Sequence, residues 1–238
     1  MTPFFMKKFI IISIISLLPF TYLLYKNYSF SKEHRIFGVE IPEGFNSLGI
    51  DVSHHQGIIN WELLSHHFKE TKVLNFVYLK ATEGTDYIDR EYANNRNSCV
   101  SLNLPHGAYH FFNPKKAPLP QADHFLNIYN PADTDLPPVL DVEIEGFSDK
   151  DLIHKMKRWL TSIEEKTGKR PVIYTSYSFY VTKFKDEFKN YKFWVAAYSI
   201  KPDILNDSRI IHWQFTEKAK LPNHKSFVDL NVSKIHFD

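Results

Sequence analysis

The sequence is poor in cysteine and in net charge. Cys99 is the one cysteine among 238 residues, so the chain cannot form an internal disulfide or build a thiolate metal cage. This excludes a disulfide-stabilised mini-domain and a zinc ribbon, and Cys99 is expected to be a small buried residue. The 29 basic and 27 acidic residues give a formal charge of +2, far from the dense basic surface that phosphate-backbone binding needs. We therefore expect no nucleic-acid partner.

The sequence also lacks an obvious set of metal ligands. It contains 12 histidines, but the pairs His54-His55 and His66-His67 have no further ligand at a metal-site spacing. Structural or surface roles are favoured for these histidines. We expect neither a metal nor any other cofactor.

What the sequence does contain is typical of a globular chain, with 43% hydrophobic and 24% charged residues. Aromatic residues reach 16%, which is high. In a soluble domain such an excess forms either an aromatic core or a platform for flat ligands such as sugars. Composition leaves both open.

An apolar run over residues 9–25 follows Lys7 and Lys8. As a helix it would span roughly 25 Å, and it is longer than the usual core of a signal peptide. The absence of an A-x-A site favours an uncleaved membrane anchor over residues 1–29, although Ser29-Phe30-Ser31 leaves a cleaved signal peptide open. Because the two lysines should stay cytoplasmic, we expect the rest of the chain to be exported, and either membrane-anchored or secreted.

The folded domain is expected to begin at Leu48 and to cover residues 48–238. Residues 30–47 mix charged residues with Gly and Pro and show no clear period, which predicts a tether. We expect the domain to be a monomer.

Eight short runs rich in β-branched and aromatic residues are predicted to be strands. They cover residues 48–53, 75–81, 106–112, 138–143, 171–176, 192–199, 209–215 and 227–232. Five segments with helical character lie between the first six strands, at residues 61–70, 91–103, 120–130, 149–168 and 178–188. Asp149 is expected to cap the fourth helix, and Gly168 is expected to end it.

This alternation of strand and helix predicts an α/β fold with a parallel sheet covered by helices, and eight strands favour closure into a TIM-like barrel. After the sixth strand, the connections over 200–208 and 216–226 are short, polar and poor in apolar period. The expected architecture is therefore an irregular barrel of about (β/α)5(β)3.

Polar or aromatic residues recur near the carboxyl ends of the predicted strands, which form the active face of parallel barrels. They include Asp51, Lys80, Tyr109, Asp141, Glu143, Tyr174, Trp194, Tyr198, Gln214 and Asp229. Any one of them could be structural, but several on one rim indicate a site.

Two of these residues form a carboxylate pair. Asp141 and Glu143 are two positions apart on a predicted strand, so their side chains point to the same side with Cα atoms roughly 6.5 to 7 Å apart. Like charges this close disfavour joint ionisation, so one carboxyl should keep its proton to higher pH, as a general acid requires. The pair favours a glycosidase. An exposed strand face, or a hard-cation site that includes Glu145, also stays open on these residues alone.

Several motifs occur in a fixed order along the chain: GIDVSHHQG at 49–57, KATEG at 80–84, DVE at 141–143 and VDLN at 228–231. With them the chain resembles the family 25 glycoside hydrolases, the Chalaropsis-type lysozymes, from about Leu48 to Asn231. The resemblance implies an irregular barrel with five β/α units. It also implies an N-acetylmuramidase that cleaves the β-1,4 bond between N-acetylmuramic acid and N-acetylglucosamine in peptidoglycan.

The same resemblance implies roles for individual residues. Glu143 would be the general acid and Asp141 its partner carboxylate, acting either as a nucleophile or by orienting the substrate's own 2-acetamido group; the second is favoured here. Asp51 and Asp229 match the two other active-site acids of the family. The substrate-binding positions would be Tyr109, Tyr174, Trp194, Tyr198 and Gln214.

Three other functions stay open on the sequence. The first is a catalytically inactive domain that binds peptidoglycan or a chitin-like glycan, against which the presence of all four acids argues. The others are a glycosidase for chitin-like polymers and a metal-dependent hydrolase.

Overall fold

The computed structural model describes residues 35–45, 47–71, 73–130, 136–198 and 203–237. The chain divides into two compact units between Ile41 and Pro42. In the first unit, strands β1 (Arg35–Ile36) and β2 (Val39–Glu40) pair antiparallel, so part of the predicted tether forms a small hairpin. The predicted anchor over residues 1–29 lies outside the described residues. Among the residues that are described, no helix is both long and apolar enough to cross a membrane.

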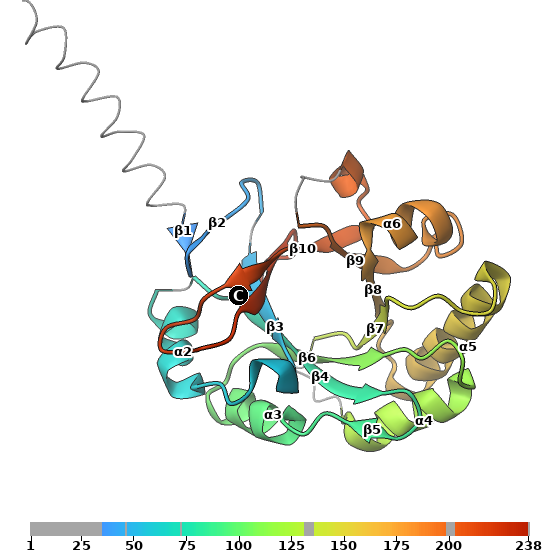
Figure 1. Cartoon of the computed structure of the whole chain (residues 1–238), viewed down its shortest axis with the longest axis horizontal. Coiled ribbons are helices and arrows are strands. Elements are labelled where there is room, and N and C mark those ends of the chain that lie inside the picture. Colours follow the sequence, from blue (N-terminus) through green and yellow to red (C-terminus); the bar gives the residue numbers. More distant parts are fainter. Residues whose placement is uncertain (1–34, 46, 72, 131–135, 199–202, 238) are drawn as a thin grey trace, which may run out of the picture. The chain divides into compact units, whose positions relative to one another are not determined.

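The second unit is a closed barrel of eight strands, seen end-on in Figure 1. The strands follow one another in the order β3-β11-β10-β9-β8-β7-β6-β4, and pairing of β3 with β4 closes the ring. All eight predicted strands are present, with bounds β3 Ser47–Val52, β4 Phe76–Glu83, β6 His106–Phe111, β7 Val139–Val142, β8 Val172–Ser176, β9 Lys192–Ala196, β10 Ile210–Ala219 and β11 Val228–Ser233. A short strand, β5 (Tyr87–Ile88), pairs with the end of β4.

The last strand corrects the expectation of a parallel sheet. Within the ring, neighbouring strands run parallel except that β11 is antiparallel to both β10 and β3. Residues 220–227, which join β10 to β11, are too few for the crossover of a dozen or more residues that a parallel connection requires. The chain therefore turns back, and β11 enters the ring from the opposite end.

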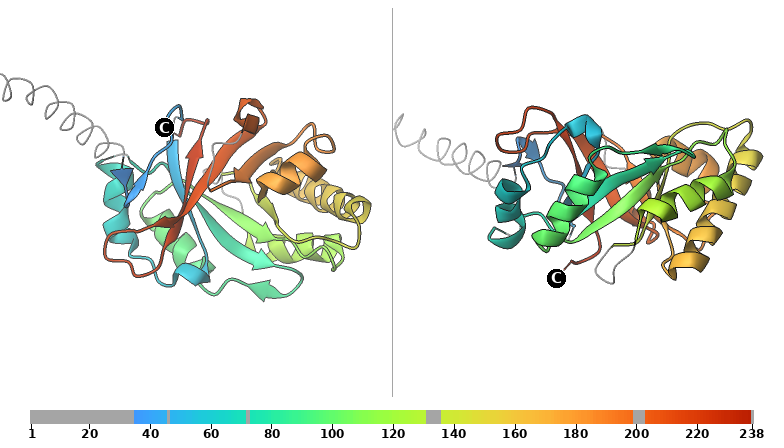
Figure 2. Two further views of the ribbon diagram at one scale, coloured as in Figure 1. Left: turned by 45° about the horizontal axis from the view of Figure 1, so that its top comes forward. Right: turned by 90° about the horizontal axis from the view of Figure 1, so that it is seen from below.

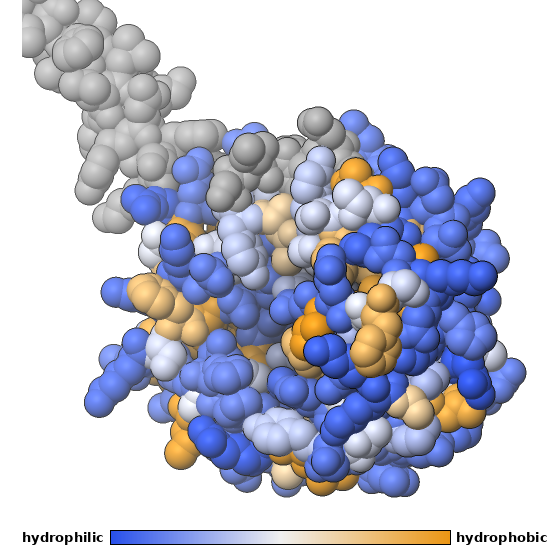
Figure 3. Space-filling model, turned by 45° about the vertical axis from the view of Figure 1, so that its right-hand side comes forward, coloured by the Kyte–Doolittle hydropathy of each residue, from blue (hydrophilic) through white to orange (hydrophobic). Residues whose placement is uncertain are grey.

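Four helices cover the outside of the barrel, as Figure 2 shows. They are α2 (Trp61–Lys69), α3 (Tyr92–Ser101), α4 (Pro118–Ile128) and α5 (Asp149–Thr167), and they match the first four predicted helices. The side of the molecule on which α5 and α6 lie presents a mostly hydrophilic face with small, scattered apolar groups (Figure 3). This is the surface expected of helices that bury one face against the barrel and leave the other to solvent.

The fifth predicted helix is not a regular α-helix. A short turn, α6 (Tyr177–Phe179), is followed by a π-helical turn over Tyr180–Phe184, in which the backbone N–H of Lys185 donates to the carbonyl of Tyr180. The remaining helical turns are the 3-10 segments η1 (His54–Gln56) and η3 (Asp203–Asn206).

The ends of α5 confirm one prediction and correct another. Gly168 ends the helix in the left-handed region with φ 69°, as expected. Ser148, however, is the N-cap in place of Asp149, because its hydroxyl accepts the backbone N–H of Asp151. Asp149 is the first helical residue, and its carboxylate pairs with Lys183.

The barrel interior contains a cluster of packed aromatic residues. Phe76, Tyr78, Tyr174 and Trp194 pack together inside it, and the ring centroids of Trp194 lie 5.0 Å from Tyr78 and 4.7 Å from Tyr174. Gly107 makes room for this packing, since a Cβ atom there would lie 2.4 Å from the Tyr78 ring. The polar side chains of the site described below lie against this aromatic cluster. Cys99 is fully buried, as predicted.

Candidate active site

A cleft opens at the carboxyl ends of the parallel strands. The structure brings all nine predicted site residues to it: Asp51, Tyr109, Asp141, Glu143, Tyr174, Trp194, Tyr198, Gln214 and Asp229. Six further residues line it, namely Ser53, His55, Gln56, Lys80, Phe111 and Glu217. Residues distant in the sequence therefore form one site, as expected for this end of a barrel.

Strand register places part of the site at one level. Asp141 on β7 is opposite Tyr174 on β8, and Tyr174 is opposite Trp194 on β9. Because residues in register on adjacent parallel strands point to the same side, these three side chains form a row across the cleft floor. Trp194 is only 2% exposed, so it contributes to the floor mainly as packing.

Asp229 reaches the cleft by a route that the sequence did not indicate. It was expected near the carboxyl end of its strand, but it is the second residue of β11, and it lies at this end of the barrel because β11 is reversed. The antiparallel register places it directly opposite Asp51, where facing Cβ atoms are about 4.5–5.5 Å apart. The two carboxyls are therefore close enough for each to change the pKa of the other.

These two acids share a proton. Burial, and then the charge of Asp51, raise the pKa of Asp229 to about 9. Burial also raises the pKa of Asp51, to about 6, against hydrogen bonds from Asn231 and Gln214 that lower it. At neutral pH the pair therefore holds one proton and one negative charge, and the hydrogen bonds from Asn231 and Gln214 favour the charge on Asp51.

Two amide side chains hold Asp51 in place. Its Oδ2 accepts the Nε2 of Gln214 at 2.9 Å and the Nδ2 of Asn231 at 2.7 Å. Asn231 belongs to the VDLN motif but was not predicted as a site residue. Its position could have been inferred, because it is two residues after Asp229 and so points to the same side of β11.

Aromatic donors fix the orientation of both amides. The hydroxyls of Tyr174 and Tyr198 donate to Oε1 of Gln214 at 2.8 and 2.7 Å, and the indole N–H of Trp194 donates to Oδ1 of Asn231 at 2.7 Å. With their oxygens occupied, the amides direct their N–H groups at Asp51. Gln214 is 2% exposed and acts as a hub that joins Tyr174 and Tyr198 to this carboxylate.

The second carboxylate pair is arranged differently. Asp141 is 6% exposed, and its Oδ1 has no hydrogen-bond partner among the described residues. Burial, and then the charge of Glu143, raise the pKa of Asp141 well above its ordinary value. Glu143 lies one position beyond the end of β7 and is exposed. Asp141 therefore keeps its proton to higher pH than an ordinary aspartate does.

The geometry above matches a known family. The sequence profile of glycosyl hydrolases family 25 matches residues 50–224. The chain belongs to glycosyl hydrolases family 25. It is 36% identical over 199 residues to the protein YegX of Escherichia coli O157:H7, covering 82% of this chain and 72% of that protein. It is 29% identical over 203 residues to lysozyme M1 of Streptomyces globisporus, covering 77% of this chain and 66% of that protein.

Solved structures of family 25 agree with the fold. A family 25 glycosyl hydrolase from Bacillus anthracis superposes with a TM-score of 0.75 at 26% identity, covering 83% of this chain and 93% of that chain. The closed α/β barrel expected from the sequence is therefore confirmed. The chain is a glycoside hydrolase.

The residues that the sequence reasoning missed lie mainly on one wall of the family 25 cleft. Lys80 lies near the end of a predicted strand but is not among the predicted site residues. It is 7% exposed, and its ammonium pairs with Glu83 at 2.8 Å and lies 4.8 Å from the Phe111 ring centroid. Ser53, His55 and Gln56 come directly after β3 in the GIDVSHHQG motif. Their proximity to Asp51 along the chain was the available signal.

Proposed function

We propose that this family 25 enzyme is an N-acetylmuramidase that cleaves the β-1,4 bond between N-acetylmuramic acid and N-acetylglucosamine in peptidoglycan. One observation carries the proposal: an exposed carboxyl, Glu143, lies next to a buried carboxyl with an unused oxygen, Asp141, in a cleft lined by aromatic residues. Glycoside hydrolysis needs two carboxyls in different environments, one to deliver a proton and one to act on the sugar side of the bond.

Glu143 is proposed as the general acid. Its exposure at the cleft lets it reach the glycosidic oxygen of a bound strand. A bound glycan would cover the carboxyl and exclude water from it, so that the proton passes to the glycosidic oxygen and not to solvent. Glu143 gives its proton to the leaving oxygen of N-acetylglucosamine as the glycosidic bond breaks.

Asp141 is proposed to orient the 2-acetamido group of the muramic acid residue. Its Oδ1 is a buried acceptor without a protein donor, and an acetamido N–H would satisfy it. Accepting this N–H also stabilises the ionised form of Asp141. The acetamido oxygen then attacks the anomeric carbon, and water opens the resulting ring while the Glu143 carboxylate takes a proton from that water.

Asp51 and Asp229 are proposed to stabilise the positive charge that develops on the sugar. Asp51 carries a negative charge at neutral pH, in the same cleft and in a fixed orientation. Charge that is already oriented before the reaction stabilises a transition state without a further cost of reorganisation. The substrate-binding roles of Tyr109, Tyr174, Trp194, Tyr198 and Gln214 remain proposals. Tyr198, which is 47% exposed, is the best placed of these aromatic rings to meet a sugar face.

Two measurements test this function. On a gel that contains cell wall, the wild-type chain should produce a cleared band and Glu143→Gln should not. Mass spectrometry of the released muropeptides should find N-acetylmuramic acid at the new reducing end. A reducing N-acetylglucosamine end, or turnover of chitin oligomers in preference to peptidoglycan, would contradict the muramidase proposal. Retained wall binding without clearing by wild type would indicate a glycan-binding domain.

The mechanism has its own test. A nucleophilic Asp141 would form a covalent glycosyl-enzyme, whereas assistance by the substrate leaves the protein unmodified. Rapidly quenched reactions should therefore show no added sugar mass on the chain. An adduct located at Asp141 would contradict the substrate-assisted route.

For the organisation of the whole chain we propose a signal anchor or signal peptide over residues 1–29, a tether over 30–47 and a monomeric catalytic domain over 48–238, outside the cytoplasm. Lys7 and Lys8 before the apolar run support this orientation, and peptidoglycan lies outside the membrane. Protease treatment of intact spheroplasts should degrade the domain. Protection from protease would contradict export.

A further inference from the structure

We propose that His55, backed by His54 and the buried Asp89, forms an additional binding surface for a hexosamine ring of the glycan strand on the wall of the cleft, and that Asp89 is the positioning residue of this surface. This inference deepens the proposed function and rests on it.

The surface lies on a turn that is rigid and close to the acids. Segment η1 (His54–Gln56) begins two residues after the end of β3, the strand that carries Asp51. Ser53 and Gln56 form a capping box: the Ser53 hydroxyl accepts the backbone N–H of His55 at 3.2 Å, and the Gln56 side chain accepts the backbone N–H of Ser53 at 2.9 Å. The turn therefore has little freedom of its own.

A buried carboxylate fixes the first histidine of the turn. The Asp89 side chain is fully buried, and its Oδ2 accepts both the backbone N–H of His54 at 3.0 Å and Nδ1 of the same residue at 2.7 Å. Its Oδ1 accepts the backbone N–H of Glu91 at 3.0 Å. A buried carboxylate with three donors is a strong constraint, in contrast to an exposed ion pair.

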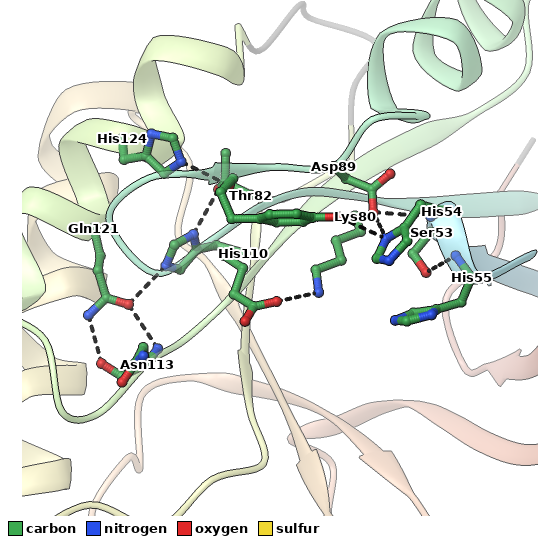
Figure 4. Close-up of polar contacts among 12 residues, drawn as sticks. Ser53, His54, His55, Lys80, Thr82, Asp89, His110, Asn113, Gln121 and His124 are labelled. Atoms are coloured by element: carbon green, nitrogen blue, oxygen red, sulfur yellow. Dashed lines mark hydrogen bonds and ion pairs between the residues drawn. The ribbon is translucent and has the colours of Figure 1, made fainter. Parts of the chain in front are cut away.

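Figure 4 shows that His54 connects the buried Asp89 carboxylate to His55, which lines the cleft. The His54 ring lies between the Asp89 carboxylate and the His55 ring, and the two ring centroids are 4.0 Å apart with a tilt of 37°. His55 is exposed and lines the cleft. Its ring is thus supported on one side by the protein and open to a ligand in the cleft.

The chemistry of this face suits a sugar ring. Desolvation, and then the charges of His54 and Lys80, lower the pKa of His55, so its ring is uncharged at neutral pH. An uncharged flat ring can lie against the C–H face of a hexosamine, while its ring nitrogens remain able to contact hydroxyl or acetamido groups. Such a contact holds ground state and transition state alike, and it should appear in KM more than in kcat.

The test uses the full-length chain with four single variants. Against soluble peptidoglycan oligomers, His55→Ala should raise KM by about three- to tenfold and change kcat by less than about twofold. His55→Phe, which keeps a flat ring, should restore KM to within about twofold of wild type. His66→Ala is the matched control, because His66 is an exposed histidine on α2 that pairs with Glu70 and does not line the cleft; it should change neither constant.

Asp89 is tested through its coupling to His55. Asp89→Asn should raise KM in the same direction, and the double variant with His55→Ala should be little worse than either single variant, since both remove one contact. Additive effects, or an Asp89→Asn variant with a lower melting temperature and an unchanged KM, would show that Asp89 has only a structural role and overturn its assignment.

A binding measurement separates this inference from the proposed function. In a Glu143→Gln background, His55→Ala should weaken oligomer binding by the same factor by which it raises KM. Unchanged affinity and KM would overturn the His55 surface even if the enzyme is an active muramidase. If wild type binds oligomers but does not cleave them, the proposed function fails, and the affinity of His55→Ala still decides this inference.

Discussion

The cleft contains two carboxylate pairs that are built in opposite ways. Asp141 and Glu143 follow one another at the end of β7, one of them buried with an unused oxygen and the other exposed. Asp51 and Asp229 face each other across the antiparallel seam between β3 and β11, and they share one proton. The first pair leaves an oxygen of Asp141 open to a ligand, whereas in the second pair the protein donates two hydrogen bonds to Asp51.

This difference indicates that the two carboxylate pairs have different roles in the proposed reaction. The seam pair is a fixed charge, because Gln214 and Asn231 donate to Asp51 and aromatic donors hold both amides. A group that moves protons must exchange them with substrate and water, and the exposed member of the β7 pair can do so. In the proposed mechanism the seam therefore supplies electrostatic stabilisation, and β7 supplies the groups that react. The following substitutions test that contrast.

The largest effect is expected at Glu143. Glu143→Gln removes the acid without changing the size of the side chain, and kcat should fall by about 10²–10⁴-fold. The melting temperature should stay unchanged, since the side chain is exposed. Glu145→Gln is the matched control, because Glu145 is also exposed, lies two residues further along and is not part of the cleft lining. A similar loss from both variants would refute the special role of Glu143.

The next largest effect is expected at Asp51, the charged residue of the pair that faces across β3 and β11. Asp51→Asn replaces an oriented carboxylate with a neutral group that can still accept the two amide N–H groups, and kcat should fall by about 10²-fold. Substrate affinity in a Glu143→Gln background should change little. A loss of less than about threefold in kcat would show that the seam charge does not act in the reaction.

A smaller effect is expected when Asn231, which donates a hydrogen bond to Asp51, is replaced. Asn231→Ala leaves the Trp194 indole N–H without its acceptor and should lower the free energy of unfolding by about 1–3 kcal/mol. It also removes a hydrogen bond that lowers the pKa of Asp51, so the acidic limb of the kcat/KM profile should move to higher pH.

Asn95→Ala is the control for that variant. Asn95 on α3 accepts the indole N–H of Trp61 at 2.9 Å and is also buried, but it does not line the cleft. It should destabilise the protein to a similar extent without moving the pH profile. If the pH profile shifted in both variants, the shift in Asn231→Ala would be due to general destabilisation and not to the lost hydrogen bond to Asp51.

The smallest effect is expected in stability as a function of pH. Asp229 and Asp51 have raised pKa values, about 9 and about 6, so the folded chain binds more protons than the unfolded chain above pH 4. The free energy of unfolding contributed by these groups is fully present below their unfolded pKa values and should fall as the pH rises to about 9.

Asp229→Asn should flatten this decline and raise the free energy of unfolding at pH 8 by about 0.5–2 kcal/mol. Asp207→Asn is a control of opposite sign. Hydrogen bonding to Arg209 holds the pKa of Asp207 below its ordinary value, so its loss should destabilise the protein at pH 8. Chemical denaturation across pH measures both variants, and a destabilised Asp229→Asn would contradict the shared proton.

The sequence was informative where a feature depends on neighbours in the chain. The eight strands and the first four helices follow from local pattern, and the Asp141–Glu143 pair follows from a spacing of two on a strand. Ordered motifs were sufficient to predict the family. The end of α5 at Gly168 was also predictable, because a left-handed residue after a helix is a local requirement.

Features that depend on the path of the chain were not predictable in this way. Asp229 lines the cleft, but it lies near the start of a strand that runs backwards and not near a carboxyl end, where the strand pattern placed it. Ser148 replaced Asp149 as a helix cap, a difference of one residue that pattern does not resolve. Gln214 was expected to contact sugar, and the fold gives its amide hydrogen bonds to Tyr174, Tyr198 and Asp51.

The sequence by itself therefore determined which strands and helices form, which carboxyls are available and to which family the chain belongs. Only the tertiary structure decided how those carboxyls divide their protons. The reversal of β11 places Asp229 against Asp51, and closure of the ring buries Asp51 and Asp141 and half-buries Asp229. The physical reason is that ionisation depends on desolvation and on charges a few Å away, and both are set by contacts between residues far apart in the sequence.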